Sequence, residues 1–222
     1  MNDAVQDYFS FFSQLFNPIV EKQPECMCGG NEVRIRLAEE AVTNSYALLQ
    51  GGDLKAYQID KHFEQLPLFN PSKVLGFRCK HDFLLLHQAE GILEVYFIEM
   101  KSGKDTFDHI RHQLQGGIAL LAYIQRLSMD RLGLKWPIGL IRFYAVALFH
   151  TKKIQETTSL DRIAEIKKWR NQERRRYKDV KGVYCVENHR IDLSEMRRCC
   201  AEVSYCLCLP NSFTTFPKEV AD

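Results

Sequence analysis

Residues 81–103 read HDFLLLHQAEGILEVYFIEMKSG and are the most informative stretch of the sequence. Two apolar runs rich in β-forming residues, 83–87 and 93–101, are separated here by a short polar segment that contains a glycine. A third run of the same kind, 74–79, precedes them after another polar break. Breaks of this length are typical of hairpins, so the sequence predicts an antiparallel meander of three strands.

Toward the C-terminus, apolar residues recur at helical spacing from about 106 to 132, with Phe107, Ile110 and Leu114 on one stripe. Residues 138–149 form a nearly continuous apolar run, which is typical of a strand buried on both faces. A basic helix over 159–178 and a strand near 183–186 complete the predicted core.

Toward the N-terminus, a Phe-rich segment that ends before Pro18 predicts an amphipathic helix, and a loop over 23–30 follows it. Asn31 suits the N-cap of a helix from about 32 to 49, which Gly51 and Gly52 would end. Residues 53–72 are weakly patterned, with Pro67 and Pro71 marking a loop. The order of elements predicts an α/β layer architecture with a mixed sheet.

An acid and a lysine stand side by side at the end of the last meander strand, in the triplet Glu99-Met100-Lys101. Alternation along a strand points Glu99 and Lys101 to the same face, where burying them without a purpose is costly. Asp82 opens the neighbouring strand, and antiparallel pairing can bring its carboxylate beside that of Glu99. Two close carboxylates repel each other, and a hard cation such as Mg²⁺ resolves the repulsion.

On these residues the chain resembles the PD-(D/E)XK nuclease superfamily, over about residues 32–150. The resemblance implies a restriction-endonuclease-like core of the order αβββαβ, with a mixed central sheet flanked by helices. It also implies a DNA nuclease, for example an endonuclease, that uses Mg²⁺ or Mn²⁺, and it leaves open endo or exo action and DNA or RNA as substrate. Asp82 and Glu99 would be the metal ligands, the carbonyl of Met100 a third ligand, and Lys101 the catalytic lysine.

Family members often add a Glu from the first helix and a Gln from the second. In this chain Glu39 matches the apolar spacing that follows the family's Glu and is preferred, whereas helical-wheel arithmetic favours Glu40, which is kept as the alternative. Gln113 lies beside the apolar stripe of the second helix and is preferred to Gln115. The family's Pro before the Asp is replaced by His81, and a Tyr four residues after either Gln is missing, so the subfamily stays open.

Cysteines cluster near both ends of the chain. Some members of the superfamily join the ends of the fold through a [4Fe–4S] cluster, and four thiolates could instead hold Zn²⁺. The alternative, which we favour, is buried or incidental cysteine. The residues concerned are Cys26, Cys28, Cys199, Cys200, Cys206 and Cys208.

The charge of the chain is concentrated in one segment. Residues 152–178 hold ten basic and four acidic side chains, a local charge of +6 in a chain whose net charge is +2. This asymmetry favours a polyanion such as DNA as partner, although a solvated helix face gives the same pattern. The residues expected to contact nucleic acid are Lys104, Lys167, Lys168, Arg170, Arg174 and Arg175.

Length and composition set the remaining expectations. A chain of 222 residues with 45% hydrophobic and 26% charged residues is neither disordered nor a coiled coil. We expect a cytoplasmic protein without a membrane segment, because the apolar runs are short and no signal peptide is visible. Three regions are expected: 1–30, a nuclease-like domain over 31–187, and a Cys-rich extension over 188–222 packed on it. A homodimer is compatible with the fold. The rival interpretation is a catalytically silent nucleic-acid-binding or scaffold protein.

Overall fold

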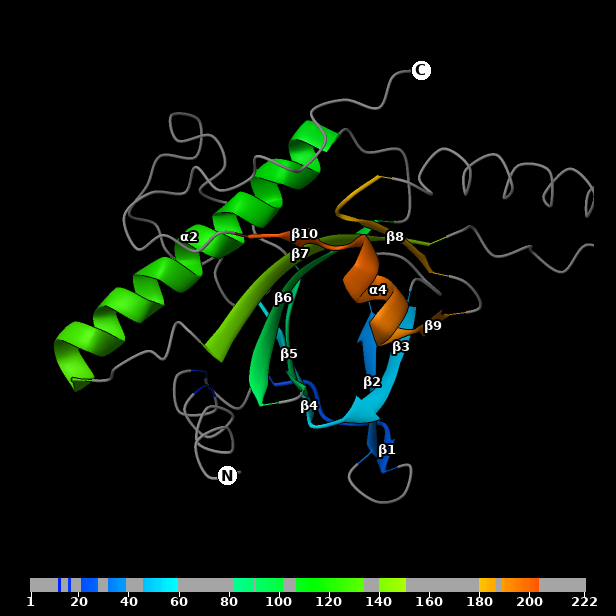
Figure 1. Cartoon of the computed structure of the whole chain (residues 1–222), viewed down its shortest axis with the longest axis horizontal. Helices are drawn as coiled ribbons and strands as arrows, with labels where there is room; N and C mark the ends of the chain where they lie inside the picture. Colours follow the sequence, from blue (N-terminus) through cyan, green and yellow to red (C-terminus); the bar gives the residue numbers. More distant parts are fainter. Residues whose placement is uncertain are drawn as a thin grey trace, which may run out of the picture.

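The central element is a six-stranded mixed sheet. The computed structural model describes residues 12, 16, 21–27, 32–38, 46–59, 82–89, 91–101, 107–133, 140–150, 180–186 and 189–203. The strand order is β10-β7-β6-β5-β4, with β8 also paired to β7 (Figure 1). The bounds of these strands are Leu54–Gln58 (β4), Phe83–Ala89 (β5), Ile92–Lys101 (β6), Ile141–His150 (β7), Val183–Val186 (β8) and Ala201–Glu202 (β10).

An antiparallel meander forms one half of this sheet. The strands predicted over 83–87 and 93–101 are confirmed as β5 and β6, which pair through a tight turn at Gly91. β4 pairs antiparallel with β5 on its other side, a strand that the weak pattern of residues 53–72 did not predict. There, buried Leu54, Ala56 and Tyr57 extend the sheet. The strand predicted over 74–79 lies outside the described residues.

A helix crosses from β6 to β7. This helix, α2 (Phe107–Leu132), confirms the prediction for 106–132, and it buries Ile110, Leu114, Ile118 and Leu121. β7 then pairs parallel to β6 along its length and is buried at residues 143–149, which confirms a strand covered on both faces. β8 confirms the strand predicted near 183–186 and lies parallel to β7.

A second, four-stranded sheet takes the place of the predicted helix over 32–49, and that prediction is therefore wrong. Its strand order is β1-β2-β3-β9, with β2 and β3 joined antiparallel. The physical reason lies in residues 33–37, where Val33, Ile35 and Leu37 alternate with two arginines and give a strand one apolar face. The bounds are Cys26–Met27 (β1), Glu32–Ala38 (β2), Tyr46–Gly52 (β3) and Arg190–Ile191 (β9).

The six-stranded sheet is covered on both faces. One face packs against α2, whose buried residues join those of β5, β6 and β7 in one apolar cluster. The other face packs against the four-stranded sheet and the short helix α4 (Leu193–Cys199), which buries Met196. Figure 1 shows α2 on one side of β7 and β6, and α4 with β2 and β3 on the other.

The described residues therefore form a mixed α/β protein with a mixed sheet. Phe12 is helical, fully buried and packed in the α2 cluster, and Phe16 packs against the same cluster. The other residues of the predicted N-terminal helix lie outside the described residues. The basic helix expected over 159–178 lies outside them as well. Within the described part of the chain, no helix is both long enough and apolar enough to cross a membrane.

Candidate active site

The pairing of β5 with β6 brings the predicted acidic residues together. Asp82 directly precedes β5, and Glu99 lies near the end of β6. Phe83 pairs with Ile98 in the ladder, so one further step in the same register puts Asp82 opposite Glu99. Residues directly opposite each other in an antiparallel pair have neighbouring side chains on one face.

Two short contacts fix the side chains at this end of β6. The backbone N–H of Met100 donates a hydrogen bond of 2.6 Å to Asp82 Oδ2. Lys101 Nζ lies 2.7 Å from Glu99 Oε1, as the expected shared face requires. Glu99 is 1% exposed and Lys101 is 8% exposed, so this ion pair is buried. Charges are retained in such a position when they are paired, because an isolated buried charge is strongly unfavourable.

Glu99 and Lys101 point to the same side of the sheet as α2. Residues 93, 95 and 97 of β6 belong to the cluster that packs against α2, and alternation extends that side to 99 and 101. Gln113 lies on α2 next to buried Leu114, and its Oε1 is buried with no hydrogen-bond partner among the described residues. This side-chain acceptor is therefore turned inward, in the layer that also contains the acids.

Several predicted site residues cannot be placed. Glu39 and Glu40 lie outside the described residues, and the helix on which their choice depended is replaced by strands on both sides of them. All six residues expected to contact nucleic acid also lie outside the described part: Lys104, Lys167, Lys168, Arg170, Arg174 and Arg175.

The donor set at Asp82 and Glu99 is compatible with a hard cation. Two carboxylates and the backbone carbonyl of Met100 supply only oxygen ligands, which Mg²⁺ prefers. Mg²⁺ is usually held by one or two carboxylates, with water and substrate phosphate completing its shell. Among the described residues no group of three or more His, Cys, Asp or Glu side chains is arranged to hold a metal. A metal ion bound here would therefore be held by those two carboxylates, with water and substrate phosphate as its remaining ligands.

Two of the described cysteines, Cys199 and Cys200, are free thiols at the end of α4, and Cys200 is buried in the cluster beneath that helix. Burial raises the pKa of both Cys199 and Cys200, so neither is an activated thiolate. Cys26 lies in β1, whereas Cys28, Cys206 and Cys208 lie outside the described residues.

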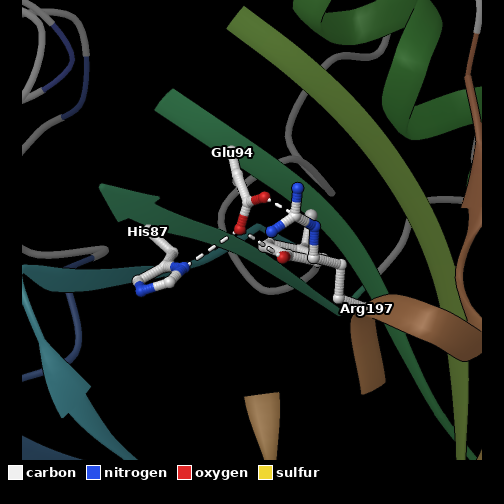
Figure 2. Close-up of polar contacts among 4 residues, drawn as sticks. His87, Glu94 and Arg197 are labelled. Atoms are coloured by element: carbon white, nitrogen blue, oxygen red, sulfur yellow. Dashed lines mark hydrogen bonds and ion pairs between the residues drawn. The ribbon is translucent and has the colours of Figure 1, made fainter. Parts of the chain in front are cut away.

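A second polar cluster, absent from the sequence predictions, surrounds Glu94 on the opposite face of β6. Glu94 is 2% exposed, and its Oε2 accepts a hydrogen bond of 2.7 Å from the Tyr96 hydroxyl. His87 Nδ1 lies 3.0 Å from the same oxygen, and Arg197 Nε lies 2.9 Å from Oε1. Figure 2 shows Glu94 between His87 of β5 and Arg197 of α4. One hairpin and a helix distant from it in sequence therefore meet at one carboxylate.

The electrostatics of this cluster keep Glu94 ionised. Burial alone raises the pKa of Glu94, but the hydrogen bonds from His87 and Tyr96 and the charge of Arg197 outweigh it, so the pKa lies below its usual value. The pKa of Arg197 is raised, mainly by a side-chain hydrogen bond with Tyr144 and also by the charge of Glu94. Desolvation lowers this pKa but is outweighed. Glu94 is therefore an anion in a fixed position, and it orients the guanidinium group of Arg197.

This cluster forms one wall of a cavity of about 840 Å³. Residues from β5, β6, β7, α4 and β10 line it. The sequence carried a partial signal for it: the hairpin register that sets Asp82 opposite Glu99 also sets His87 opposite Glu94. No local sequence motif predicts the contact between Arg197 and Glu94, because Arg197 lies far along the chain and contacts Glu94 only through the packing of α4.

Comparison of this chain with protein-family models, with curated proteins and with solved structures finds no match.

Proposed function

We propose that this protein is a Mg²⁺-dependent nuclease that hydrolyses DNA phosphodiester bonds at Asp82, Glu99 and Lys101. The observation that carries the proposal is the register of β5 and β6, which sets Asp82 opposite Glu99. The buried ion pair between Glu99 and Lys101 extends this group of charges by a lysine. Two acids and a lysine at one strand end are the residue types that metal-assisted phosphodiester hydrolysis needs.

The order of elements supports the same proposal. Phe12 is helical, and after the strands β1, β2 and β3 the chain continues with the meander β4-β5-β6, the helix α2 and the parallel strand β7. From β4 onward this order resembles the βββαβ part of the restriction-endonuclease-like core. Phe12 packs in the same apolar cluster as α2.

The chain's own side chains would act as follows. Asp82 is oriented by the Met100 N–H, and Glu99 by Lys101, so both carboxylates are fixed before substrate arrives. The ammonium group of Lys101 would donate hydrogen bonds to the attacking water and to a non-bridging phosphate oxygen. Mg²⁺, when bound, lowers the pKa of coordinated water and neutralises charge on the phosphoryl group. Hydrolysis adds one water across a P–O bond and leaves one phosphate end and one hydroxyl end.

The test is cleavage of linear duplex, closed circular and single-stranded DNA, and of RNA, with Mg²⁺ or Mn²⁺ and with EDTA. We expect metal-dependent cleavage by the wild type, and a loss of at least about a hundredfold in Lys101→Met and in Asp82→Asn. Matched controls are Lys55→Met on β4 and Asp130→Asn on α2, whose side chains are 32% and 51% exposed. The controls should cut like the wild type.

The rival function predicts a different pattern in the same assay. A silent nucleic-acid-binding protein would retain DNA in a gel-shift experiment but would cut none of the substrates with either metal. Cleavage that survives both Lys101→Met and Asp82→Asn would contradict the proposed site, because the activity would then come from elsewhere. Circular dichroism of each variant shows whether a lost activity reflects a lost fold.

A further inference from the structure

The cavity beside Glu94 is separate from the proposed nuclease site. Glu94 belongs to the face of the sheet opposite to that of Glu99, because Tyr96 and Ile98, also at even-numbered positions of β6, pack in the cluster beneath α4. The two glutamates are five positions apart along an extended strand, which corresponds to a distance of about 16 Å. A ligand of this cavity would therefore leave Asp82, Glu99 and Lys101 accessible.

The described side chains that line this cavity carry an excess of positive charge. Arg142 lies beside Glu94 in the parallel register of β6 and β7, so it continues the row of polar residues across the sheet. Lys181 Nζ donates a hydrogen bond of 2.7 Å to the backbone carbonyl of Arg198, which is a neutral acceptor. The charged residues of the lining are Arg142, Lys181, Arg197, Arg198, Glu94 and Glu202, with His87 in addition.

One of these cations is held in place before any ligand binds. Arg197 Nε lies 2.9 Å from Glu94 Oε1, and the hydroxyl of Tyr96 fixes the same carboxylate. The guanidinium group has five N–H donors, so the remaining donors stay directed by this anchor. Positioning a cation in advance reduces the entropy that a ligand would otherwise lose on binding.

We infer that this cavity binds a phosphomonoester group of an organic ligand. Among the described residues that line the cavity, four cationic side chains outnumber two carboxylates, and this excess of two positive charges matches a group of charge −1.5 to −2 near neutral pH. Guanidinium groups also suit phosphate oxygens geometrically. The cavity volume of about 840 Å³ lies in the range of small-molecule sites and exceeds the needs of phosphate alone. Leu193, Tyr144 and Ala201 supply apolar wall for the organic part.

The phosphomonoester can belong to a free mononucleotide or to the 5′ end of a polynucleotide. We would titrate the full chain with AMP, inorganic phosphate and adenosine in EDTA, by calorimetry at pH about 7.5. A 5′-phosphorylated and a 5′-hydroxyl oligonucleotide of one sequence form the second arm. We expect saturable binding of AMP, weaker binding of phosphate, and none of adenosine at the same concentration. A preference for the 5′-phosphorylated oligonucleotide would extend the site to strand ends.

Variants locate the binding. Arg142→Ala and Arg198→Ala change exposed side chains and should each weaken AMP binding by at least about tenfold. Arg126→Ala removes an arginine of α2 outside the cavity and should leave the affinity unchanged. Asp82→Asn should also bind AMP normally, which separates this site from the proposed nuclease site.

Three results would overturn the inference. The first is no saturable AMP binding by the wild type together with equal binding of the two oligonucleotides. The second is unchanged AMP affinity in both Arg142→Ala and Arg198→Ala. The third is a loss of binding in Asp82→Asn, since AMP would then occupy the opposite face. None of these results depends on nuclease activity, because every titration is made without a divalent metal.

Discussion

Glu94 is the residue on which most polar contacts of the second cluster converge. Its two oxygens accept from Tyr96, His87 and Arg197, so each of these donors depends on a carboxylate at this position. A hydrogen bond to a charged group contributes more than one between neutral groups, and a buried acceptor without its donor is penalised. Single substitutions in this cluster should therefore lower the free energy of unfolding by more than their small changes in side-chain volume would explain.

Removing the Tyr96 hydroxyl tests the strength of this cluster. Tyr96→Phe leaves the ring in the core and deletes the hydrogen bond of 2.7 Å to Glu94 Oε2. We expect the free energy of unfolding to fall by about 1.5–3 kcal/mol, as measured by urea denaturation. Tyr123→Phe is the matched control, because Tyr123 is 60% exposed on α2 and should change stability by less than about 0.5 kcal/mol. Equal effects of the two substitutions would contradict a stabilising role for the Tyr96 hydroxyl.

The lowered pKa of Glu94 predicts a dependence of stability on pH. Because the pKa is lower in the folded than in the unfolded state, ionised Glu94 stabilises the fold above a pH of about 4.5, its ordinary value. That contribution is lost as the pH falls through the folded-state pKa. The stability difference between wild type and Glu94→Gln, from urea denaturation, should therefore shrink between about pH 5.5 and about pH 3.5. A difference that stays constant over this window would contradict the prediction.

At the scale of elements, the turn between β5 and β6 sets the register of both polar clusters. Gly91 has a φ of 81°, and a Cβ there would meet no atom within 4 Å. Its φ lies in the left-handed region, which residues with a Cβ enter only at a cost in energy. Any destabilisation on substitution must accordingly come from the backbone rather than from crowding.

Gly91→Ala should lower the free energy of unfolding by about 1 kcal/mol. Gly91→Asn should lower it by less than half as much, because asparagine enters the left-handed region more readily. Thermal and urea denaturation of both variants measure the difference. An alanine variant as stable as the asparagine variant would show that the turn adjusts its backbone, and the register would then have to be fixed by the strands alone.

The strands that the sequence predicts are those whose pattern is unambiguous. β5, β6 and β7 are apolar on both faces, and the 26-residue helix α2 has a continuous apolar stripe, so periodicity and length identify each of them. Residues 32–49 carry two patterns at once. A stripe at helical spacing coexists with the alternation of Val33, Ile35 and Leu37, and long-range pairing with β3 decides for the strand.

The same distinction between local and long-range information applies to the two polar clusters. Asp82, Glu99 and Lys101 are related by one hairpin, so local register predicts which of their side chains share a face. The contact between Arg197 and Glu94 depends on how α4 packs over the sheet after more than a hundred residues of chain. No local rule connects two positions so far apart, since their meeting is a property of the tertiary fold.

At the scale of the whole molecule, β6 belongs to two apolar clusters at once. Residues 93–100 are all buried, and their side chains alternate between the cluster under α2 and the cluster under α4. β6 also pairs with β5 on one edge and with β7 on the other. Loss of either layer would therefore expose one face of the strand that supports the other layer, so we expect the two layers to unfold together.

Two leucines test this coupling, because Leu49 of β3 and Leu114 of α2 are both fully buried but lie in different clusters. Leu49→Ala and Leu114→Ala should each lower the free energy of unfolding by about 2–5 kcal/mol, in a single urea transition. Amide hydrogen exchange in β6 should become faster in both variants. In each variant the free energy of opening should fall by as much as the free energy of unfolding, because these amides open only with the whole sheet. Leu140→Ala, at a residue 41% exposed, should change neither quantity appreciably. If the layers were independent, Leu49→Ala would leave exchange in β6 unchanged while α2 still covered it, and unfolding would separate into two transitions.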